Sequence, residues 1–318
     1  MARSKTAPSS LCGVLNIDKP AGMTSHDVVD HVRKAAHMRK VGHTGTLDPM
    51  ATGVLPLCLG RATRIAQFLI AEDKEYRVRM RLGLVTDSQD TTGKVIEERD
   101  PGELDPARVA AVLEGFVGER RQIPPMISAK HHEGKRLYEL AREGVEVERE
   151  PITITVHEIL FHGICGREVE FTVACGKGTY IRTLCHDMGQ ALGVGAAMSG
   201  LVRTRCGALR VEDAVPLAEL TSRESVESHL CSMAEALSTM AGVQVDARQV
   251  GLLRNGQPAT GGGVLAVLGE FGMGARVRIL DAGGHLVAVG KSLISSANLD
   301  RLGGNLHVVQ PLRVLLEE

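Results

Sequence analysis

The sequence predicts an α+β fold for a chain of 318 residues. Residues 74–84 alternate between apolar and polar side chains, which is typical of a strand with one buried face. Residues 25–36 instead repeat apolar side chains at helical spacing. From residue 243 onward, short apolar runs are separated by glycine turns, which predicts a separate β-rich unit. A chain of this length can fold as two domains.

The N-terminal part is expected to contain short strands and helices on either side of a polar loop. Residues 1–10 are polar and predict a loose tail, and residues 11–17 predict a strand. Ser25 is expected to cap the first helix. Residues 54–59 predict a buried strand and residues 62–69 a helix.

The loop from Gly42 to Leu55 has the composition of a functional site because it combines small and polar residues with one carboxylate, Asp48. Pro49 moves Asp48 away from helical torsions toward extended backbone. The glycines of the loop allow unusual torsions or the close approach of another backbone. An Asp-Pro turn between two buried strands is the alternative interpretation. No Gly-Lys-Ser/Thr closes the stretch, so it is not a phosphate loop.

The strand at residues 74–84 begins its apolar face with Tyr76 and carries three arginines on the opposite face. Aromatic side chains are scarce, with three Tyr, five Phe and no Trp in the chain. Tyr76 is therefore a candidate stacking surface. A core tyrosine that satisfies its hydroxyl with one hydrogen bond is the alternative.

The middle of the chain predicts a helix, an irregular insertion and a hairpin. Asp105 is expected to cap a helix over residues 106–116. Residues 124–151 contain a Pro pair and a charged helix with little apolar stripe, which predicts a weakly cored lobe. Residues 152–162 and 168–175 alternate like two strands joined by a short turn.

Arg182 lies in the first turn of a helix predicted over residues 179–192. The helix dipole mildly disfavours a cation at this end, so we expect Arg182 to have a carboxylate partner. In the C-terminal third, residues 216–240 are predicted to contain a helix rich in Ser, Glu and small apolar residues. The β-rich unit over residues 243–318 follows it and contains a hairpin signal at Asp281 to His285.

Composition indicates an ordinary cytosolic protein. Apolar residues make up 43% and charged residues 24% of the chain, and no long apolar run or secretory signal is present. Seven cysteines without a CxxC pair argue against a disulfide framework or a zinc ribbon, and Cys185 beside His186 is more consistent with packing than with metal binding. The net charge is −1, yet residues 1–82 hold thirteen Lys or Arg and seven Asp or Glu, a local charge of +6. A basic, nucleic-acid-binding face is therefore possible on a neutral protein.

Motifs along residues 13–212 resemble the bacterial tRNA pseudouridine-55 synthase family of the TruB type. They are GVLNIDKPAGMTSHDVV, GHTGTLDPMATGVL, KEYRVRMRLG, QIPPMISA, GKRLYELAREG, CGKGTYIRTL and GLVRTR, in the family's order. The resemblance implies a pseudouridine synthase fold with a central mixed, mainly antiparallel sheet flanked by helices, within a catalytic domain over residues 11–240. Residues 124–151 would be a thumb-like insertion that grips the T-stem and loop. Residues 243–318 resemble a PUA domain, a small β pseudobarrel, with a generic β-barrel appendage as the alternative.

The resemblance also assigns roles to single residues. Asp48 would be the catalytic carboxylate, with Arg182 pairing to it and Tyr76 stacking on the flipped uracil. His43 would fill the space that the base leaves, and Leu201 would pack against the base. The remaining expected site residues are Tyr180 as a pocket support, Lys19 and Pro20 as the scaffold of the loop, and Lys130, Lys135 and Arg136 as RNA contacts. The family commonly has Ser-Ala-Leu-Lys where this chain has Ser128-Ala129-Lys130-His131.

Pseudouridine formation breaks one glycosidic bond and makes another without redox change, so neither a cofactor nor a metal is implied. Asp48 could attack C1′, attack C6 or first remove the C2′ proton. We expect tRNA as the partner of a cytoplasmic monomer that needs no membrane and no guide RNA. Two alternatives are a tRNA-binding folding chaperone in which catalysis is secondary and a guide-RNA-dependent synthase.

Overall fold

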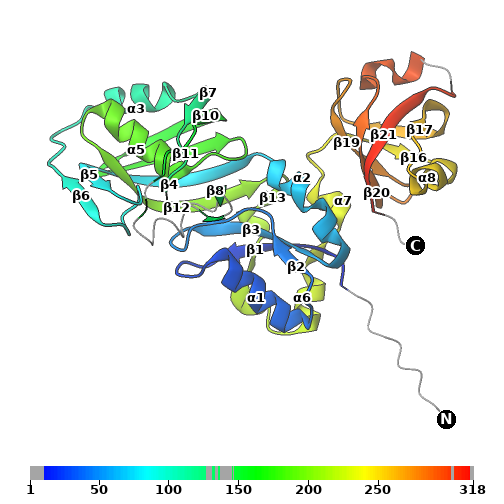
Figure 1. The fold of residues 1–318 in the computed structure, drawn as a ribbon, viewed down its shortest axis with the longest axis horizontal. Helices are drawn as coiled ribbons and strands as arrows, with labels where there is room; N and C mark the ends of the chain where they lie inside the picture. Colours follow the sequence, from blue (N-terminus) through cyan, green and yellow to red (C-terminus); the bar gives the residue numbers. More distant parts are fainter. Residues whose placement is uncertain are drawn as a thin grey trace, which may run out of the picture.

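The computed structural model describes residues 11–126, 131–132, 135–136, 145, 147–301 and 304–315 (Figure 1). Within these residues the protein forms an 11-stranded sheet and, near the C-terminus, a 6-stranded sheet. Helices cover the larger sheet, so the predicted α+β class is confirmed. None of the helices in the described ranges is long and apolar enough to cross a membrane.

The larger sheet has the strand order β14-β1-β3-β12-β4-β11-β10-β7. Most neighbours are antiparallel, while β1–β14 and β3–β12 are parallel, so the sheet is mixed as expected. The strands on this path are β1 (Gly13–Lys19), β3 (Thr52–Leu59), β4 (Lys74–Leu82), β7 (Gly118–Gln122), β10 (Ile152–Cys165), β11 (Glu168–Cys175), β12 (Ala196–Cys206) and β14 (Val215–Pro216). Shorter strands pair off it or form two small sheets: β2 (Val41–His43), β13 (Leu209–Arg210), β15 (Leu230–Cys231), β5 (Leu84–Thr86) with β6 (Val95–Glu98), and β8 (His131–His132) with β9 (Lys135–Arg136).

Strand β4 lies at the centre and shows the predicted alternation. Tyr76 and every second residue after it are buried, and the intervening arginines are exposed. The strand ends at Leu82, because the next residue, Gly83, has a φ of +76° and would place a Cβ 2.3 Å from the Arg99 carbonyl oxygen. The prediction of one strand through Leu84 is therefore wrong at this glycine, and Leu84 belongs to β5.

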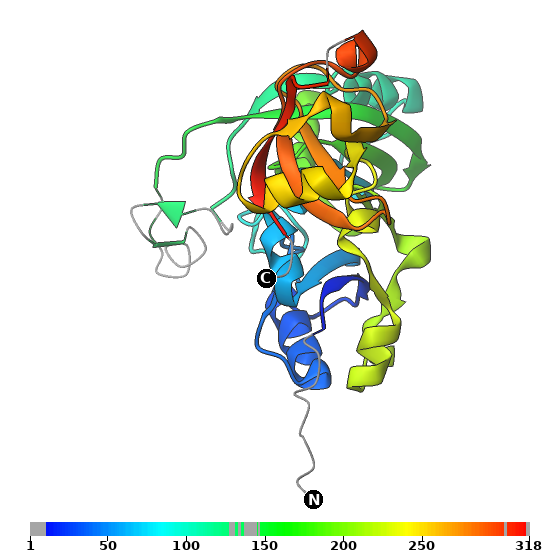
Figure 2. The same cartoon turned by 90° about the vertical axis from the view of Figure 1, so that its right-hand side faces the viewer.

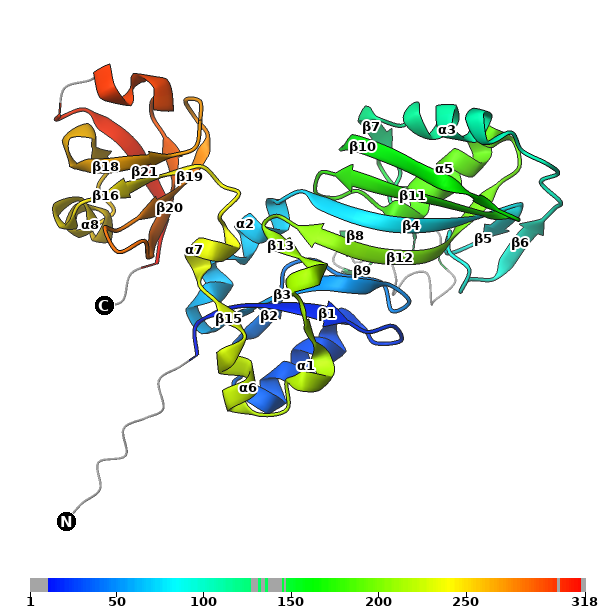
Figure 3. The same cartoon turned by 180° about the vertical axis from the view of Figure 1, so that it is seen from behind.

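Helices α3 (Pro106–Glu114) and α5 (Ile181–Leu192) lie on one face of the larger sheet (Figures 1 and 3). Their buried side chains join those of β4, β11 and β12 in one apolar core. Asp105 caps α3 as predicted by accepting a hydrogen bond from the Ala107 N–H. The buried side of β4 therefore faces the helices, and its arginines face solvent.

Two local predictions are wrong. Thr24, not Ser25, caps α1 (Ser25–Ala36), because its hydroxyl accepts from the Asp27 N–H within a capping box. The helix expected over residues 62–69 is a 3-10 turn, Gly60–Ile65, followed by α2 (Ala66–Ala71). The stretch 216–240 does contain helix as expected, in two short pieces, α6 (Arg223–Ser228) and α7 (Met233–Ala236), which serine residues at positions 222 and 232 cap separately.

The C-terminal sheet has the order β17-β21-β20-β19-β16-β18 and its own apolar core. Its elements are β16 (Gly242–Val245), α8 (Ala247–Arg254), β17 (Ala259–Thr260), β18 (Val264–Leu268), β19 (Arg276–Leu280), β20 (Leu286–Ser292) and β21 (His307–Val314). The predicted hairpin turn is present, since the Asp281 N–H donates to the His285 carbonyl. A second apolar cluster joins Leu280 and Leu286 to Leu237 and Val14, so this domain packs against the first one.

The predicted insertion over residues 124–151 is described only in part. Its β8–β9 hairpin stands apart from the larger sheet in Figure 2. Lys130, and the side chains of Lys135 and Arg136, lie outside what the structure describes, as does the predicted tail over residues 1–10.

We expect a glycine-to-alanine substitution to have opposite effects on the free energy of unfolding at two helical positions. A Cβ at Gly189 in α5 would lie 2.2 Å from the Ala196 backbone nitrogen, whereas a Cβ at the exposed Gly251 in α8 would meet nothing within 4 Å. We expect Gly189→Ala to lower the free energy of unfolding by about 1–3 kcal/mol. Gly251→Ala should raise it by about 0.5–1 kcal/mol, because alanine loses less backbone entropy in a helix. Urea denaturation followed by circular dichroism measures both, and shifts of the same sign would contradict the packing of α5 on β12.

Candidate active site

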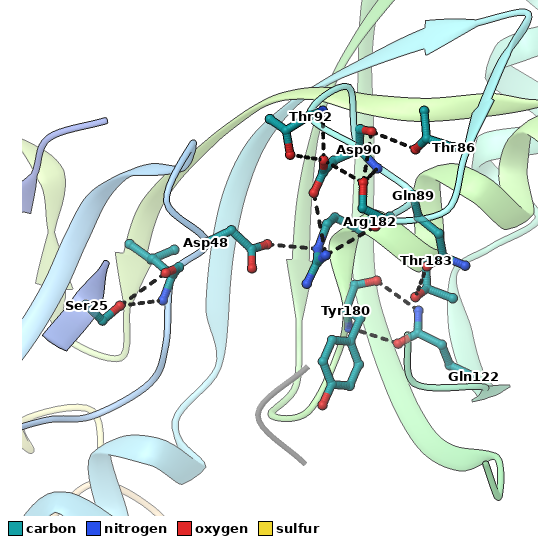
Figure 4. Close-up of polar contacts among 12 residues, drawn as sticks. Ser25, Asp48, Thr86, Gln89, Asp90, Thr92, Gln122, Tyr180, Arg182 and Thr183 are labelled. Atoms are coloured by element: carbon teal, nitrogen blue, oxygen red, sulfur yellow. Dashed lines mark hydrogen bonds and ion pairs between the residues drawn. The ribbon is translucent and has the colours of Figure 1, made fainter. Parts of the chain in front are cut away.

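Asp48 and Arg182 meet within the larger domain although 134 positions separate them in the chain. The Asp48 Oδ2 lies 2.9 Å from the Arg182 Nε, so the carboxylate partner expected for Arg182 is present (Figure 4). The Arg182 side chain is only 6% exposed, whereas the Asp48 side chain is 29% exposed. The carboxylate is thus held from inside the protein and remains accessible from outside.

A second carboxylate, Asp90, anchors the other side of Arg182. The Arg182 Nη1 lies 3.5 Å from the Asp90 Oδ2 and donates to the Ser88 carbonyl oxygen at 3.2 Å. The other carboxylate oxygen of Asp90 accepts hydrogen bonds from the Ser88 hydroxyl and from the N–H and hydroxyl of Thr92. Asp90 is buried and its own geometry is fixed, so it in turn fixes the guanidinium.

Two side chains from the N-terminal segment hold the loop that carries Asp48. The hydroxyl of Ser25 accepts from the Leu47 N–H at 2.9 Å and donates to the Leu47 carbonyl at 3.2 Å. The ammonium of the buried Lys19 donates to the carbonyls of Pro49 and Ala51, at 3.2 Å and 2.7 Å, and to that of Pro20. Burial lowers the pKa of Lys19 to about 8 against the opposing attraction of Asp48. Lys19 therefore bonds directly to the loop, whereas Pro20 accepts a hydrogen bond only from Lys19.

Arg203 on β12 is buried on the opposite side of the same loop. Its Nε donates to the Val54 carbonyl at 2.6 Å and its Nη2 to the Gly45 carbonyl at 3.3 Å. Gly53 has a φ of +94°, and a Cβ there would lie 2.3 Å from the Arg203 carbonyl oxygen. Only glycine allows the loop to lie this close to β12.

Tyr76, Leu201 and His43 gather around Arg203. Tyr76 on β4 is the cross-strand partner of Arg203, and Leu201 on β12 pairs with the neighbouring Val78. Tyr76 is 9% exposed, and burial raises the pKa of its hydroxyl to about 12, so the phenol is neutral near pH 7. Burial, with Arg203 as the second cause, lowers the pKa of His43 on β2.

Tyr180 directly precedes α5 and is held through its backbone. Its N–H donates to the side-chain oxygen of Gln122 at 2.8 Å, and its carbonyl accepts from the side-chain nitrogen of Gln122 at 3.0 Å (Figure 4). These two bonds attach the start of α5 to the end of β7. The position of Arg182 in the first turn follows from this attachment.

The sequence interpretation missed three residues that the structure places at the site. Asp90 and Ser25 are polar residues of ordinary appearance, and only their partners reveal a role. Arg203 stands inside the GLVRTR motif, but its spacing to Asp48 carries no local signal. The only local indication of a role for Arg203 is that a charged residue stands in a largely apolar stretch of sequence.

The electrostatics of Asp48 are set by opposing causes. Burial of the carboxylate raises its pKa above the ordinary value of 3.8, and the nearby charge of Asp90 raises it further. Arg182 and Lys19 lower the pKa, with Arg182 the larger of the two. The arrangement offers a partly exposed carboxylate held by a buried arginine, which suits attack on a carbon or removal of a proton. No group of three or more His, Cys, Asp or Glu that could hold a metal occurs in the described part of the chain.

Family models match this chain over most of its length. Residues 33–181 match the TruB family pseudouridylate synthase N-terminal domain, and residues 182–240 match the tRNA pseudouridylate synthase B C-terminal domain. Residues 242–315 match the PUA domain. The resemblance stated from the motifs, including the PUA domain, is therefore confirmed.

Individual relatives agree with these models. The chain is 48% identical over 229 residues to a tRNA pseudouridine synthase B of Alkaliphilus oremlandii, covering 72% of this chain and 76% of the relative. It is 44% identical over 276 residues to that of Syntrophotalea carbinolica, covering 86% and 90%. Among solved structures, a chain of a Cbf5-Nop10-Gar1 complex superposes with a TM-score of 0.77 at 31% identity, covering 96% of this chain and 85% of that one. The predicted fold is thereby confirmed.

The charge of Asp90 predicts a shift in the titration of Asp48. Because that charge raises the pKa of Asp48, Asp90→Asn should move the pKa of Asp48 down from its wild-type position. In the wild type the carboxylate should take up its proton at a pH above 3.8 as the solution is acidified. The Asp48 side-chain carbon shift in ¹³C NMR measures both values. Asp100→Asn, at an exposed carboxylate paired with Arg167, is the control and should leave the titration unchanged.

Proposed function

This chain belongs to the TruB family of pseudouridylate synthases and is a tRNA pseudouridine synthase, an isomerase; we propose that it converts uridine 55 of the T-loop, with Asp48 as the catalytic carboxylate. The observation that carries the proposal is the ion pair between the exposed edge of Asp48 and the buried Arg182. An arginine held by a second carboxylate keeps the first one ionised and aimed.

The reaction needs the uracil to leave the ribose, turn and bond again through C5. Asp48 supplies the carboxylate for any of the three first steps on C1′, C6 or the C2′ proton, and no external group enters or leaves. Arg182 stabilises its charge during the step. Lys19 and Ser25 hold the loop so that the carboxylate does not move away as the base turns.

The uridine must be extruded from its loop before Asp48 can reach it. Tyr76 supplies a ring for the extruded uracil to stack on, and Leu201 supplies apolar contact beside it. The hydroxyl of Tyr76 is neutral near pH 7, so the main roles of Tyr76 are stacking and hydrogen bonding. Any part in proton transfer at C5 is secondary. His43 occupies the place that the base has left, and Tyr180 supports the mouth of the site.

The substrate is proposed to be tRNA in the cytoplasm, bound by a monomer along its T-stem and loop. Lys130, Lys135 and Arg136 of the insertion are the proposed phosphate contacts, with the PUA domain as a second RNA-binding surface. Relatives of 44–48% identity carry the name tRNA pseudouridine synthase B, which favours action without a guide RNA.

A guide-dependent synthase is the second candidate, because the chain superposes on a Cbf5-Nop10-Gar1 complex component with a TM-score of 0.77. The two candidates differ in what the purified protein does alone. A guide-independent enzyme modifies a bare T-stem-loop transcript, whereas a guide-dependent one leaves it unchanged. A folding chaperone, the third alternative, would bind the transcript whether or not it modified it.

Asp48→Asn tests the catalytic assignment. Tritium release from a C5-labelled T-stem-loop should fall by at least about 10³-fold, because the amide cannot act as nucleophile or base. Binding of the transcript, measured by filter retention, should stay within about threefold, since the two side chains have the same shape. Asp100→Asn should release tritium at the wild-type rate. Release by Asp48→Asn at that same rate would show that another group does the chemistry.

A further inference from the structure

Arg203 is the largest of the fully buried side chains and has 1% of its surface exposed. It makes no ion pair with a carboxylate anywhere in the described part of the chain. Its guanidinium instead donates to the carbonyls of Val54 and Gly45, on either side of Asp48 in the chain, and its charge acts on the hydroxyl of Tyr76, its cross-strand partner on β4. One planar group thus links the two parts of the site that come from different strands.

Fold stability alone does not explain a cation at this position. Burying a charge without a counter-ion costs several kcal/mol, and apolar residues of similar volume commonly replace buried charges without loss of stability. The cross-strand partners of Arg203 are Tyr76 of β4 and Gly53 of β3, and neither carries a charge that would compensate the guanidinium. An apolar substitution at Arg203 would remove the hydrogen bonds to the Val54 and Gly45 carbonyls.

We propose that Arg203 is a positioning residue that holds the phenol of Tyr76 in register with the Asp48 loop. The inference rests on the proposed function, in which Tyr76 and Asp48 act on the same uridine. Without Arg203 the Tyr76 phenol and the Asp48 carboxylate remain chemically unchanged, but no shared partner fixes the distance between them. The loss therefore falls on turnover and not on RNA affinity.

Arg203→Lys is the informative substitution because it keeps the charge and removes the planar fork. We expect kcat for tritium release to fall by about 10²-fold, with KM within about threefold of wild type. Arg205→Lys is the matched control. Arg205 lies two residues further along β12, is partly exposed, and has its Nε 3.9 Å from Glu75 Oε2, so this variant should stay within about twofold on both constants.

A double-mutant cycle with Tyr76→Phe shows whether Arg203 acts through the phenol. Under single-turnover conditions, Arg203→Lys should slow the wild-type protein by about 10²-fold and the Tyr76→Phe protein by less than about fivefold. Equal factors in the two backgrounds would overturn the proposal. A loss of cooperative thermal unfolding in Arg203→Lys would also overturn it, because the arginine would then be a stability element.

A second measurement needs no catalysis. Burial is the largest cause of the lowered pKa of His43, and the charge of Arg203 is the second. Arg203→Met removes that charge, so the pKa of His43 measured by ¹H–¹⁵N NMR should rise toward 6.5. Arg203→Lys keeps the charge and should change the pKa much less. An unchanged His43 titration in a folded Arg203→Met protein would show that the two side chains do not share one site. Wild-type protein that releases no tritium would instead defeat the proposed function, and the His43 titration would still test the geometry around Arg203 by itself.

Discussion

The buried guanidinium of Arg182 is the constraint on which the rest of the site depends. A charge with 6% exposure needs compensation, and it is compensated by Asp48 on one side and Asp90 on the other. These carboxylates come from loops before β3 and after β5, and Arg182 itself starts α5. One electrostatic requirement therefore fixes three segments that are distant in sequence.

The central strands explain why this arrangement is rigid. Strands β4 and β12 are neighbours in the middle of the sheet, and their register places Tyr76 opposite Arg203. The Asp48 loop packs so closely on β12 that Gly53 has no room for a side chain. Lys19 and Ser25 complete the enclosure from β1 and α1. A nucleotide that enters the site thus meets groups held by the core of the domain and not by mobile side chains.

Three of the positive charges in the first 82 residues lie on the solvent-exposed face of the larger sheet. Arg77, Arg79 and Arg81 contribute to that segment's surplus of positive charge, and all three lie on the solvent face of β4, away from Tyr76. Glutamates of β11 stand opposite two of them, and Arg77 is 3.3 Å from Glu170. Part of the basic surplus is therefore neutralised within the sheet.

The sequence by itself determined the fold class, the larger-sheet strands β1, β3, β4, β10 and β11, the cap of α3 and the C-terminal hairpin turn, because alternation, capping and turn chemistry are local. It also indicated Asp48 and Arg182, since a carboxylate in a glycine-rich loop and a cation at a helix start are unusual where they stand. Tertiary structure alone decided the partners. Asp90, Ser25 and Arg203 carry no local signal because their roles lie in contacts across tens to hundreds of residues. Ser25 also shows this at the start of α1: its hydroxyl bonds to Leu47 of the site loop, 22 positions away, whereas the cap itself is the local capping box of Thr24 with Asp27.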